Sequence, residues 1–105
     1  MAKNWTAPQI AKHKVSDGNE PLVMLTAYDA PGGRMVSEAG ADIILVGDTL
    51  AMVVLGYEDT MQVTIEDMVH HTAAVARAEP DAFIVADLPW TVSYTHLTLP
   101  TTMWV

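Results

Sequence analysis

The sequence contains no cysteine and few basic residues. Without cysteine, the chain cannot form disulfide bonds or zinc sites built from thiolates. Only 5 Lys and Arg residues stand against 13 Asp and Glu residues, which gives a formal net charge of −8. Such a chain lacks the basic patch that neutralises nucleic-acid phosphates, and an anionic membrane surface does not attract it. The composition therefore predicts no nucleic-acid partner and no membrane partner.

Long hydrophobic runs are also absent. No apolar run approaches the roughly 18 residues of a membrane span, and the N-terminus has no apolar region typical of a signal peptide. Half of the 105 residues are hydrophobic, so the chain can bury a core. We expect a cytoplasmic protein that forms one small domain or part of a larger one.

Short apolar runs alternate with segments of helical spacing. This order predicts an α/β fold in which parallel strands are joined by crossover helices. Because the strands are continuously apolar, we expect both faces of the sheet to be covered. The expected strands are Leu22–Ala27, Ile43–Asp48 and Phe83–Asp87, and the expected helices are Trp5–Lys14, Ala30–Ala39 and Thr64–Ala78.

Capping residues mark the ends of these helices. Thr6 can cap the leading helix, Thr64 and Asp67 form a variant of the capping box, and Gly40 is a typical stop signal. The helix that begins after Thr64 is expected to bury a stripe of residues at helical spacing. This stripe comprises Ile65, Met68, Val69, Thr72 and Ala76.

Two of the expected strands end in an aspartate, Asp48 and Asp87. Parallel strands end at the same edge of a sheet, so both carboxylates should project from one edge, where α/β folds place their chemistry. Two converging carboxylates with no cation nearby in the sequence favour a divalent metal held by oxygen, with Mg²⁺ before others. Taken alone, Asp48 could equally be a strand-end or cap residue without a ligand.

Other polar residues have simpler interpretations. The neighbours His70 and His71 point about 100° apart on a helix, so His71 is expected to pack or to hydrogen-bond within the helix. Asp29 could line the site, but a helix cap explains it at least as well. A hydrolase triad of Ser93, His96 and Asp87 lacks the context of a nucleophile elbow. The segment Met52–Leu55 is most simply a packing or interface segment.

Several motifs in order resemble the ketopantoate hydroxymethyltransferase family. They cover the region from about Leu22 to Trp90, and their combined order and spacing is more specific than any one motif. The matching segments are Leu25–Asp29 (LTAYD), Val46–Leu50 (VGDTL), Met52–Thr60, Val63–Thr64, His71–Val75 (HTAAV) and Ala86–Trp90 (ADLPW).

The resemblance implies a fold and a reaction. The fold would be the N-terminal portion, about three βα units, of a (β/α)8 TIM barrel of the phosphoenolpyruvate/pyruvate superfamily. The reaction would transfer a hydroxymethyl group from methylene-tetrahydrofolate to 3-methyl-2-oxobutanoate, giving 2-dehydropantoate for pantothenate biosynthesis. In this family Mg²⁺ chelates the oxo acid and stabilises the enolate. The full-length parent would also be a homo-oligomer.

The motif match also implies roles for individual residues. Asp48 and Asp87 would hold the metal, and Asp48, Thr49 and Asp87 would bind the oxo-acid substrate. The family's general-base glutamate, its third metal-site glutamate and its substrate-binding lysine all lie beyond the matching region, so no catalytic residue is assigned here. The chain departs from the family pattern at five places, none of which removes a metal ligand. These are Gly32-Gly33, Thr49 for serine, Ala51 for glycine, Met61-Gln62 for Leu-Pro, and His70 for tyrosine.

The C-terminal segment does not resemble the family. Val92–Thr101 reads as the translation of a transposon-end adapter used in sequencing libraries. We therefore expect residues 1–91 to form a partial barrel domain and residues 92–105 to be a non-native tail. Without the remaining strands and catalytic residues the chain should be inactive, with an open strand edge and uncovered apolar faces.

Two other functions remain open at this point. One is a Mg²⁺-dependent oxo-acid lyase or mutase of the same superfamily. The other is a truncated, non-catalytic fragment that only packs or assembles. A Lys-x-Glu sequence on the next strand would favour the transferase over the lyase or mutase. Stabilisation by Mg²⁺ with the oxo acid would argue against the non-catalytic fragment.

Overall fold

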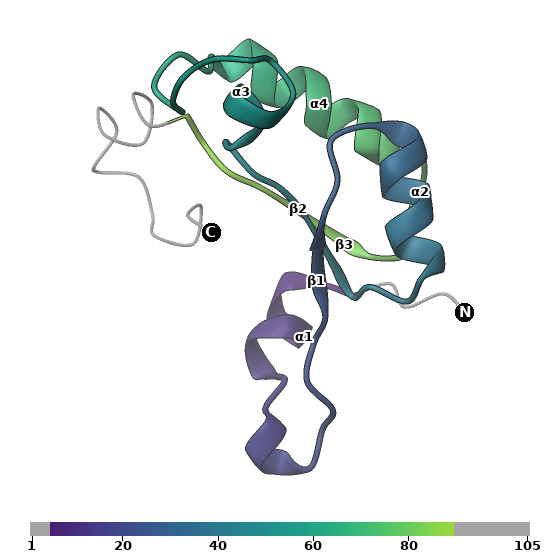
Figure 1. Cartoon of the computed structure of the whole chain (residues 1–105). Helices are drawn as coiled ribbons and strands as arrows, with labels where there is room; N and C mark the ends of the chain where they lie inside the picture. Colours follow the sequence, from purple (N-terminus) through teal and green to yellow (C-terminus); the bar gives the residue numbers. More distant parts are fainter. Residues whose placement is uncertain (1–4, 90–105) are drawn as a thin grey trace.

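The computed structural model describes residues 5–89, which contain a parallel three-stranded sheet (Figure 1). Its strands β1 (Met24–Thr26), β2 (Ile43–Val46) and β3 (Phe83–Ala86) lie in the order β1-β2-β3. Ile43 of β2 pairs with Met24 on one side and with Phe83 on the other. This confirms the predicted parallel α/β arrangement, although each strand is shorter than the expected run, which was Leu22–Ala27, Ile43–Asp48 or Phe83–Asp87.

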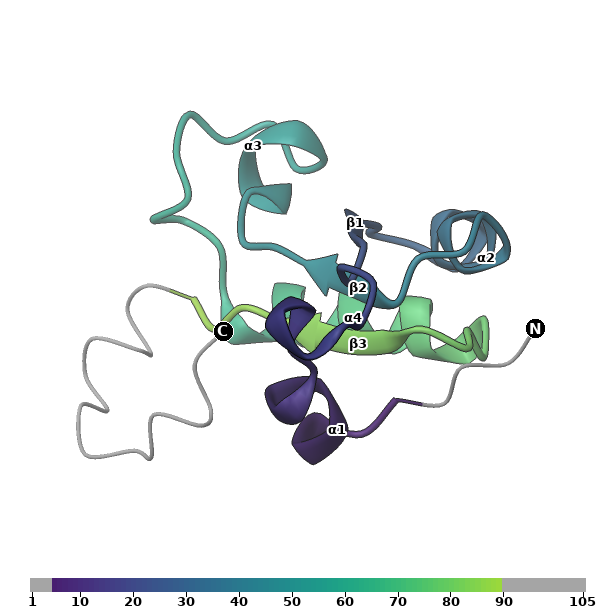
Figure 2. The ribbon, with the colours of Figure 1, turned by 90° about the horizontal axis from the view of Figure 1, so that it is seen from below.

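Two helices follow β1 and β2 and pack against each other. They are α2 (Ala30–Glu38) and α4 (Ile65–Arg77), and both lie on the same side of the sheet (Figures 1 and 2). This is the arrangement that right-handed crossovers between neighbouring parallel strands produce. Within the described part of the chain, no helix is long and apolar enough to cross a membrane.

The N-terminal segment is anchored to the sheet by a buried carboxylate. Asp42, which is 5% exposed, accepts hydrogen bonds from the indole Nε1 of Trp5 at 3.2 Å and from the backbone N–H of Val23 at 3.0 Å. Trp5 leads into α1 (Ala7–Lys12), which is shorter than the expected Trp5–Lys14, and a 3₁₀ turn (Val15–Asp17) follows it. Asp42 therefore ties Trp5 and the segment before β1 to the start of β2.

The predicted capping and stop residues of the helices are confirmed. Thr6 and Gln9 form a reciprocal capping box at α1, and Thr64 and Asp67 form another at α4. Gly40, just after α2, has a φ of +102°, a conformation that glycine adopts without steric cost. These local signals are readable from sequence because each one depends on residues at most four positions apart.

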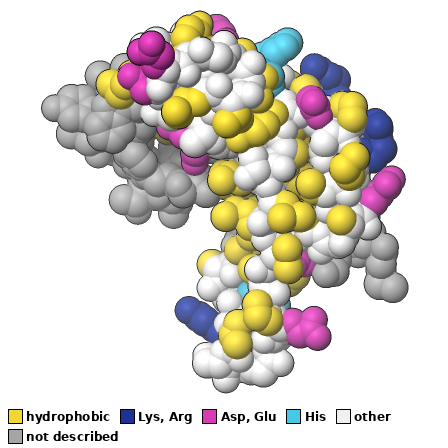
Figure 3. Space-filling model, in the orientation of Figure 1, with side chains coloured by type: hydrophobic (Ala, Val, Ile, Leu, Met, Phe, Trp, Pro, Cys, Tyr) yellow, Lys and Arg dark blue, Asp and Glu magenta, His cyan; other side chains and the backbone are white. Residues whose placement is uncertain are grey.

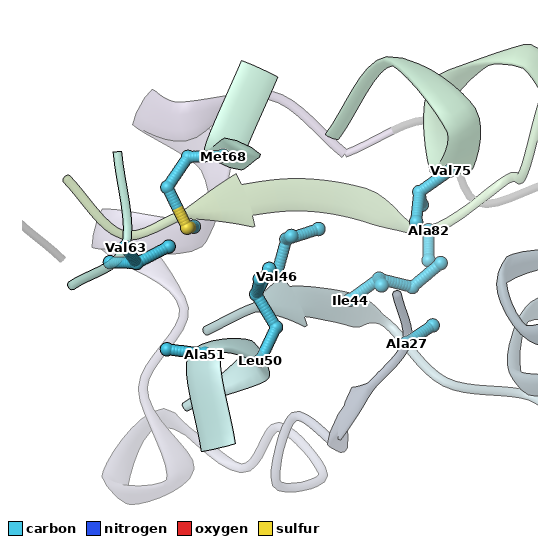
Figure 4. Close-up of a cluster of buried hydrophobic side chains, with 9 residues drawn as sticks. All are labelled: Ala27, Ile44, Val46, Leu50, Ala51, Val63, Met68, Val75 and Ala82. Carbon is cyan, nitrogen blue, oxygen red and sulfur yellow. The ribbon is translucent and has the colours of Figure 1, made fainter. Parts of the chain in front are cut away.

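The core lies between β2 and the helices on one side of the sheet. Ile44 and Val46, which alternate along β2, are fully buried and point into it, whereas Ile43 and Leu45 are half-buried. Figure 4 shows these side chains in one cluster with residues from α4, from the helix after β2 and from the loops. The cluster comprises Ala27, Ile44, Val46, Leu50, Ala51, Val63, Met68, Val75 and Ala82.

The expectation that both faces of the sheet are covered is wrong for β1. Met24 is 52% exposed and Leu25 is 40% exposed. Figure 3 shows hydrophobic side chains at the surface along the strip where Figure 1 places β1. The reason is that α2 and α4 both cover the same side, and β1 lies at the edge of the sheet.

The predicted buried stripe of α4 is only partly correct. Met68 is buried as expected, but Ile65 and Val69 are 42% and 61% exposed, and Val75 takes the second core position. Met68 and Val75 are seven positions apart, about two helical turns, so they share a face. The expected stripe lies beside this face and lines an apolar hollow of about 370 Å³. The hollow is lined by Ile65, Met68, Val69, Thr72, Ala73, Ala76, Ala86, Asp87, Leu88 and Pro89.

The loop after β2 contains a short helix that sequence patterning did not predict. This helix, α3 (Leu50–Val53), buries Leu50 and Ala51 completely. Its four residues are too few for a helical period to be recognised in the sequence. The side chains of Met52–Leu55, expected to pack, are 37% to 68% exposed.

The close approach of α2 to α4 explains why a glycine, Gly33, occurs inside α2. A Cβ atom added at Gly33 would lie 3.1 Å from Cγ1 of Val75, so the missing side chain lets α2 approach α4 closely. Val75 is fully buried and β-branched in a helix, which leaves its side chain little room to move.

We predict that Gly33→Ala lowers the free energy of unfolding. Overpacking against Val75 costs about 1–3 kcal/mol, which exceeds the gain of about 1 kcal/mol in helix propensity. In a Val75→Ala background the clash is absent, so the same substitution should be stabilising by about 1 kcal/mol. Urea unfolding of the four variants measures this coupling. A stabilising effect in both backgrounds would show that the helices do not need the glycine.

Candidate functional site at the carboxyl ends of the strands

The two aspartates predicted to converge lie next to each other. Asp87 directly follows β3, and its backbone N–H donates to the carbonyl oxygen of Val46 at 3.0 Å, which continues the β2–β3 pairing. The backbone N–H of Asp48 donates to Oδ2 of Asp87 at 3.1 Å. The prediction that both residues occupy one edge of the sheet is therefore confirmed.

Gly47 leaves room between the polar groups of this edge. A Cβ atom added there would lie 3.4 Å from Oγ1 of Thr49 and 3.6 Å from Oδ2 of Asp87. The hydroxyl and the carboxylate therefore flank the same small space. Asp48 and Asp87 are half-buried, whereas Thr49 is exposed. The three residues predicted to bind substrate thus lie together at one edge.

The environment of Asp48 disfavours its ionised form. Burial raises the pKa of the Asp48 carboxyl, and the negative charge of Asp87 raises this pKa further, while a backbone hydrogen bond opposes the shift. A divalent cation between the carboxylates would remove the repulsion. The donor set therefore fits a hard metal ion with oxygen ligands, such as Mg²⁺.

The structure adds Tyr28, which sequence reasoning did not assign to the site. Its hydroxyl lies 3.1 Å from Oγ1 of Thr49, and its carbonyl oxygen accepts a hydrogen bond from Nδ1 of His71 at 2.7 Å. Tyr28 follows β1 by two residues, so its place at the carboxyl edge of the sheet was the available signal. Of the two roles expected for His71, packing or a hydrogen bond within its helix, the hydrogen bond is wrong, because Nδ1 bonds to this distant backbone group.

The other candidate residues that lie within residues 5–89 make local contacts. Asp29 caps α2, since its Oδ1 accepts from the N–H of Gly32 at 2.7 Å. The rings of His70 and His71 lie edge to face, with 5.4 Å between their centroids. No group of three His, Cys, Asp or Glu side chains is placed to hold a metal in this range. Ser93, His96, Trp90 and the predicted tail lie outside the described residues.

We predict that Asp87→Asn lowers the pKa of Asp48. The substitution removes the neighbouring charge, while the amide oxygen can still accept the Asp48 N–H. A raised pKa means that ionisation of Asp48 destabilises the fold as pH rises through its titration range, so the variant should lose less stability there. NMR titration of the Asp48 carboxyl carbon in metal-free protein measures the shift. Asp81→Asn is the matched control, and an unchanged Asp48 pKa in Asp87→Asn would contradict the assignment.

Comparison with known proteins gives one family. A sequence profile described as ketopantoate hydroxymethyltransferase matches residues 4–99. A 3-methyl-2-oxobutanoate hydroxymethyltransferase of Geobacillus sp. (strain WCH70) is 57% identical over 86 residues, 82% of this chain and 30% of the relative. One of Bacillus cereus (strain B4264) is 53% identical over 90 residues, 86% of this chain and 32% of the relative.

The match covers most of this chain but a minority of each relative. The chain spans about a third of the length of these curated relatives. The profile match and the identity over most of the chain agree with the motifs and with the paired aspartates at the sheet edge. The chain belongs to the ketopantoate hydroxymethyltransferase family.

Proposed function

We propose that this chain supplies the metal-binding and oxo-acid-binding edge of an enzyme that transfers a hydroxymethyl group from methylene-tetrahydrofolate to 3-methyl-2-oxobutanoate. The product would be 2-dehydropantoate. The observation that carries the proposal is the hydrogen bond from Asp48 N–H to Asp87 Oδ2, which joins two carboxylate residues at the ends of adjacent parallel strands. Membership of the family and the names of the relatives support the same reaction.

Asp48 and Asp87 are the residues that would hold Mg²⁺. Both offer carboxylate oxygen, and their mutual repulsion gives the site a preference for a cation. Bound Mg²⁺ would supply Lewis-acid polarisation of the oxo acid. Two carboxylates cannot complete the near-octahedral ligand set that Mg²⁺ demands, so further ligands must come from water, substrate or protein outside residues 5–89.

The residues of this chain would bind and orient the substrate. The Thr49 hydroxyl and backbone N–H would donate hydrogen bonds to the oxo acid, and Asp87 would keep the Asp48 backbone in place through its Oδ2. Holding the substrate in one orientation reduces the entropic cost of reaction. The general base that removes the substrate proton would lie outside residues 1–91.

The complete enzyme would be a (β/α)8 barrel of which these strands form the beginning. The β1-β2-β3 order, with α2 and α4 on one side, supports this proposal because it is the repeating unit of such barrels. In the barrel, further strands would extend the sheet beyond β3. The boundary predicted at residue 91 stays a prediction, and the family profile extends to residue 99.

A chimeric enzyme tests the proposed reaction. Residues 1–91 would replace the matching segment of the Geobacillus sp. relative, and we expect formation of 2-dehydropantoate from 3-methyl-2-oxobutanoate. Asp48→Asn or Asp87→Asn should lower kcat/KM by about 100-fold or more, because Lewis-acid stabilisation is worth several kcal/mol. Glu38→Gln, an exposed acidic position near the opposite edge of the sheet, is the control. A folded but inactive chimera would overturn the proposed reaction.

Thermal unfolding separates binding from catalysis. Mg²⁺ together with 3-methyl-2-oxobutanoate should raise the Tm of the chimera, because a ligand that binds only the folded state stabilises it. The rise should disappear in Asp48→Asn and persist in Glu38→Gln. We expect no rise for the 105-residue chain alone, because two carboxylates supply too few of the ligands that Mg²⁺ demands. A clear rise for that chain would show that water and substrate complete the ligand set without further protein residues.

A further inference from the structure

The side chain of Thr49 lacks the usual anchor of a helix-capping residue. Thr49 stands at the N-cap of α3, but its side chain makes no hydrogen bond to that helix, and the residue is exposed. An exposed threonine without such a bond would exchange between side-chain rotamers. The hydroxyl direction must therefore be fixed by another group if Thr49 is to bind a ligand in one orientation.

Tyr28 is the group that meets this hydroxyl. The two oxygen atoms are 3.1 Å apart, although the residues are 21 positions apart in the sequence. The ring of Tyr28 packs against the buried hydrophobic cluster and is half-buried. Two ring torsions and close packing leave the phenol little freedom. Tyr28 therefore offers Thr49 a fixed partner.

His71 fixes the backbone that carries Tyr28. Its Nδ1 donates to the Tyr28 carbonyl oxygen at 2.7 Å, which joins α4 to the segment between β1 and α2. The helix that presents His71 is itself held by its capping box and by Met68 and Val75 in the core. The loop at Tyr28 is thus tied to a rigid element of the fold.

We infer that His71 and Tyr28 are positioning residues that hold the Thr49 hydroxyl in the orientation needed to bind the oxo acid. The inference rests on the proposed function, because it assigns a purpose to Thr49. His71 acts through the Tyr28 backbone, and Tyr28 acts through its phenol. Neither residue belongs to the metal-binding pair.

The orientation of Thr49 can be measured in the 105-residue chain without a ligand. Three-bond NMR couplings to the Thr49 methyl carbon report its χ1 rotamer, and we expect a single rotamer in the unmodified chain. Tyr28→Phe should give averaged couplings. His71→Ala should do the same although His71 does not hydrogen-bond Thr49, and His71→Asn, whose amide N–H can replace Nδ1–H, should restore the single rotamer.

Two matched controls separate this effect from general perturbation. Tyr57→Phe removes an exposed phenol near α3, and Arg77→Ala removes an exposed side chain at the far end of α4 from the capping box. Both should leave the Thr49 couplings unchanged. Unchanged couplings in a folded Tyr28→Phe variant would overturn the inference. If His71→Ala fails to fold, His71→Asn and Tyr28→Phe still decide the matter.

The consequence for binding is tested in the chimera. Tyr28→Phe and His71→Ala should each raise KM for 3-methyl-2-oxobutanoate about tenfold with a smaller change in kcat, since each loses one hydrogen bond of ordinary strength. His71→Asn should recover most of the loss. If kcat falls and KM rises by similar factors in all three variants, and Tm also falls, the two residues have a purely structural role and the inference is wrong. An inactive unmodified chimera with the predicted Thr49 couplings would overturn the proposed reaction alone.

Discussion

The pairing of β2 with β3 is the constraint on which the candidate site depends. Its register places Val46 opposite Ala86. One further hydrogen bond, from Asp87 N–H to the Val46 carbonyl oxygen, sets the point at which the two strands leave the sheet. Asp48 and Asp87 meet because both strands run in the same direction and end together. A slip of one residue would turn the alternating side chains of the slipped strand to the opposite face of the sheet and shift one carboxylate relative to the other.

The proximity of the two carboxylates would favour binding of a cation, but it does not stabilise the folded chain. Burial and repulsion raise the pKa of Asp48, so the metal-free site is least favourable when both groups are ionised. The rest of the molecule offsets this through contacts remote from the edge. The fully buried Ile44 and Val46 hold β2 against the helices, and Asp42 ties the N-terminal segment to its start. Polar chemistry at one end of a strand therefore depends on apolar packing along it.

The sequence allowed the strands, the helix caps and the aspartate pair to be predicted, because each depends on local pattern or on strand direction alone. The capping box of Thr64 and Asp67 needs residues three apart, and the pair Asp48 and Asp87 needs only that parallel strands share an edge. The contact of Tyr28 with Thr49 could not be predicted in the same way. It depends on the path of the loop that leads into α3. A helix of four residues is too short for its position to be recognised from sequence periodicity.

Burial was predicted less well than topology for a related physical reason. An apolar residue indicates that a side chain favours an apolar environment, but the neighbouring elements decide which face receives one. In α4 the face with Met68 and Val75 meets the core, whereas Ile65 and Val69 line an open apolar hollow next to Asp87. The same helix also carries His71, which reaches the loop at Tyr28. One helix thus joins the core, an uncovered apolar surface and the candidate site, so its packing against α2 and the sheet positions all three.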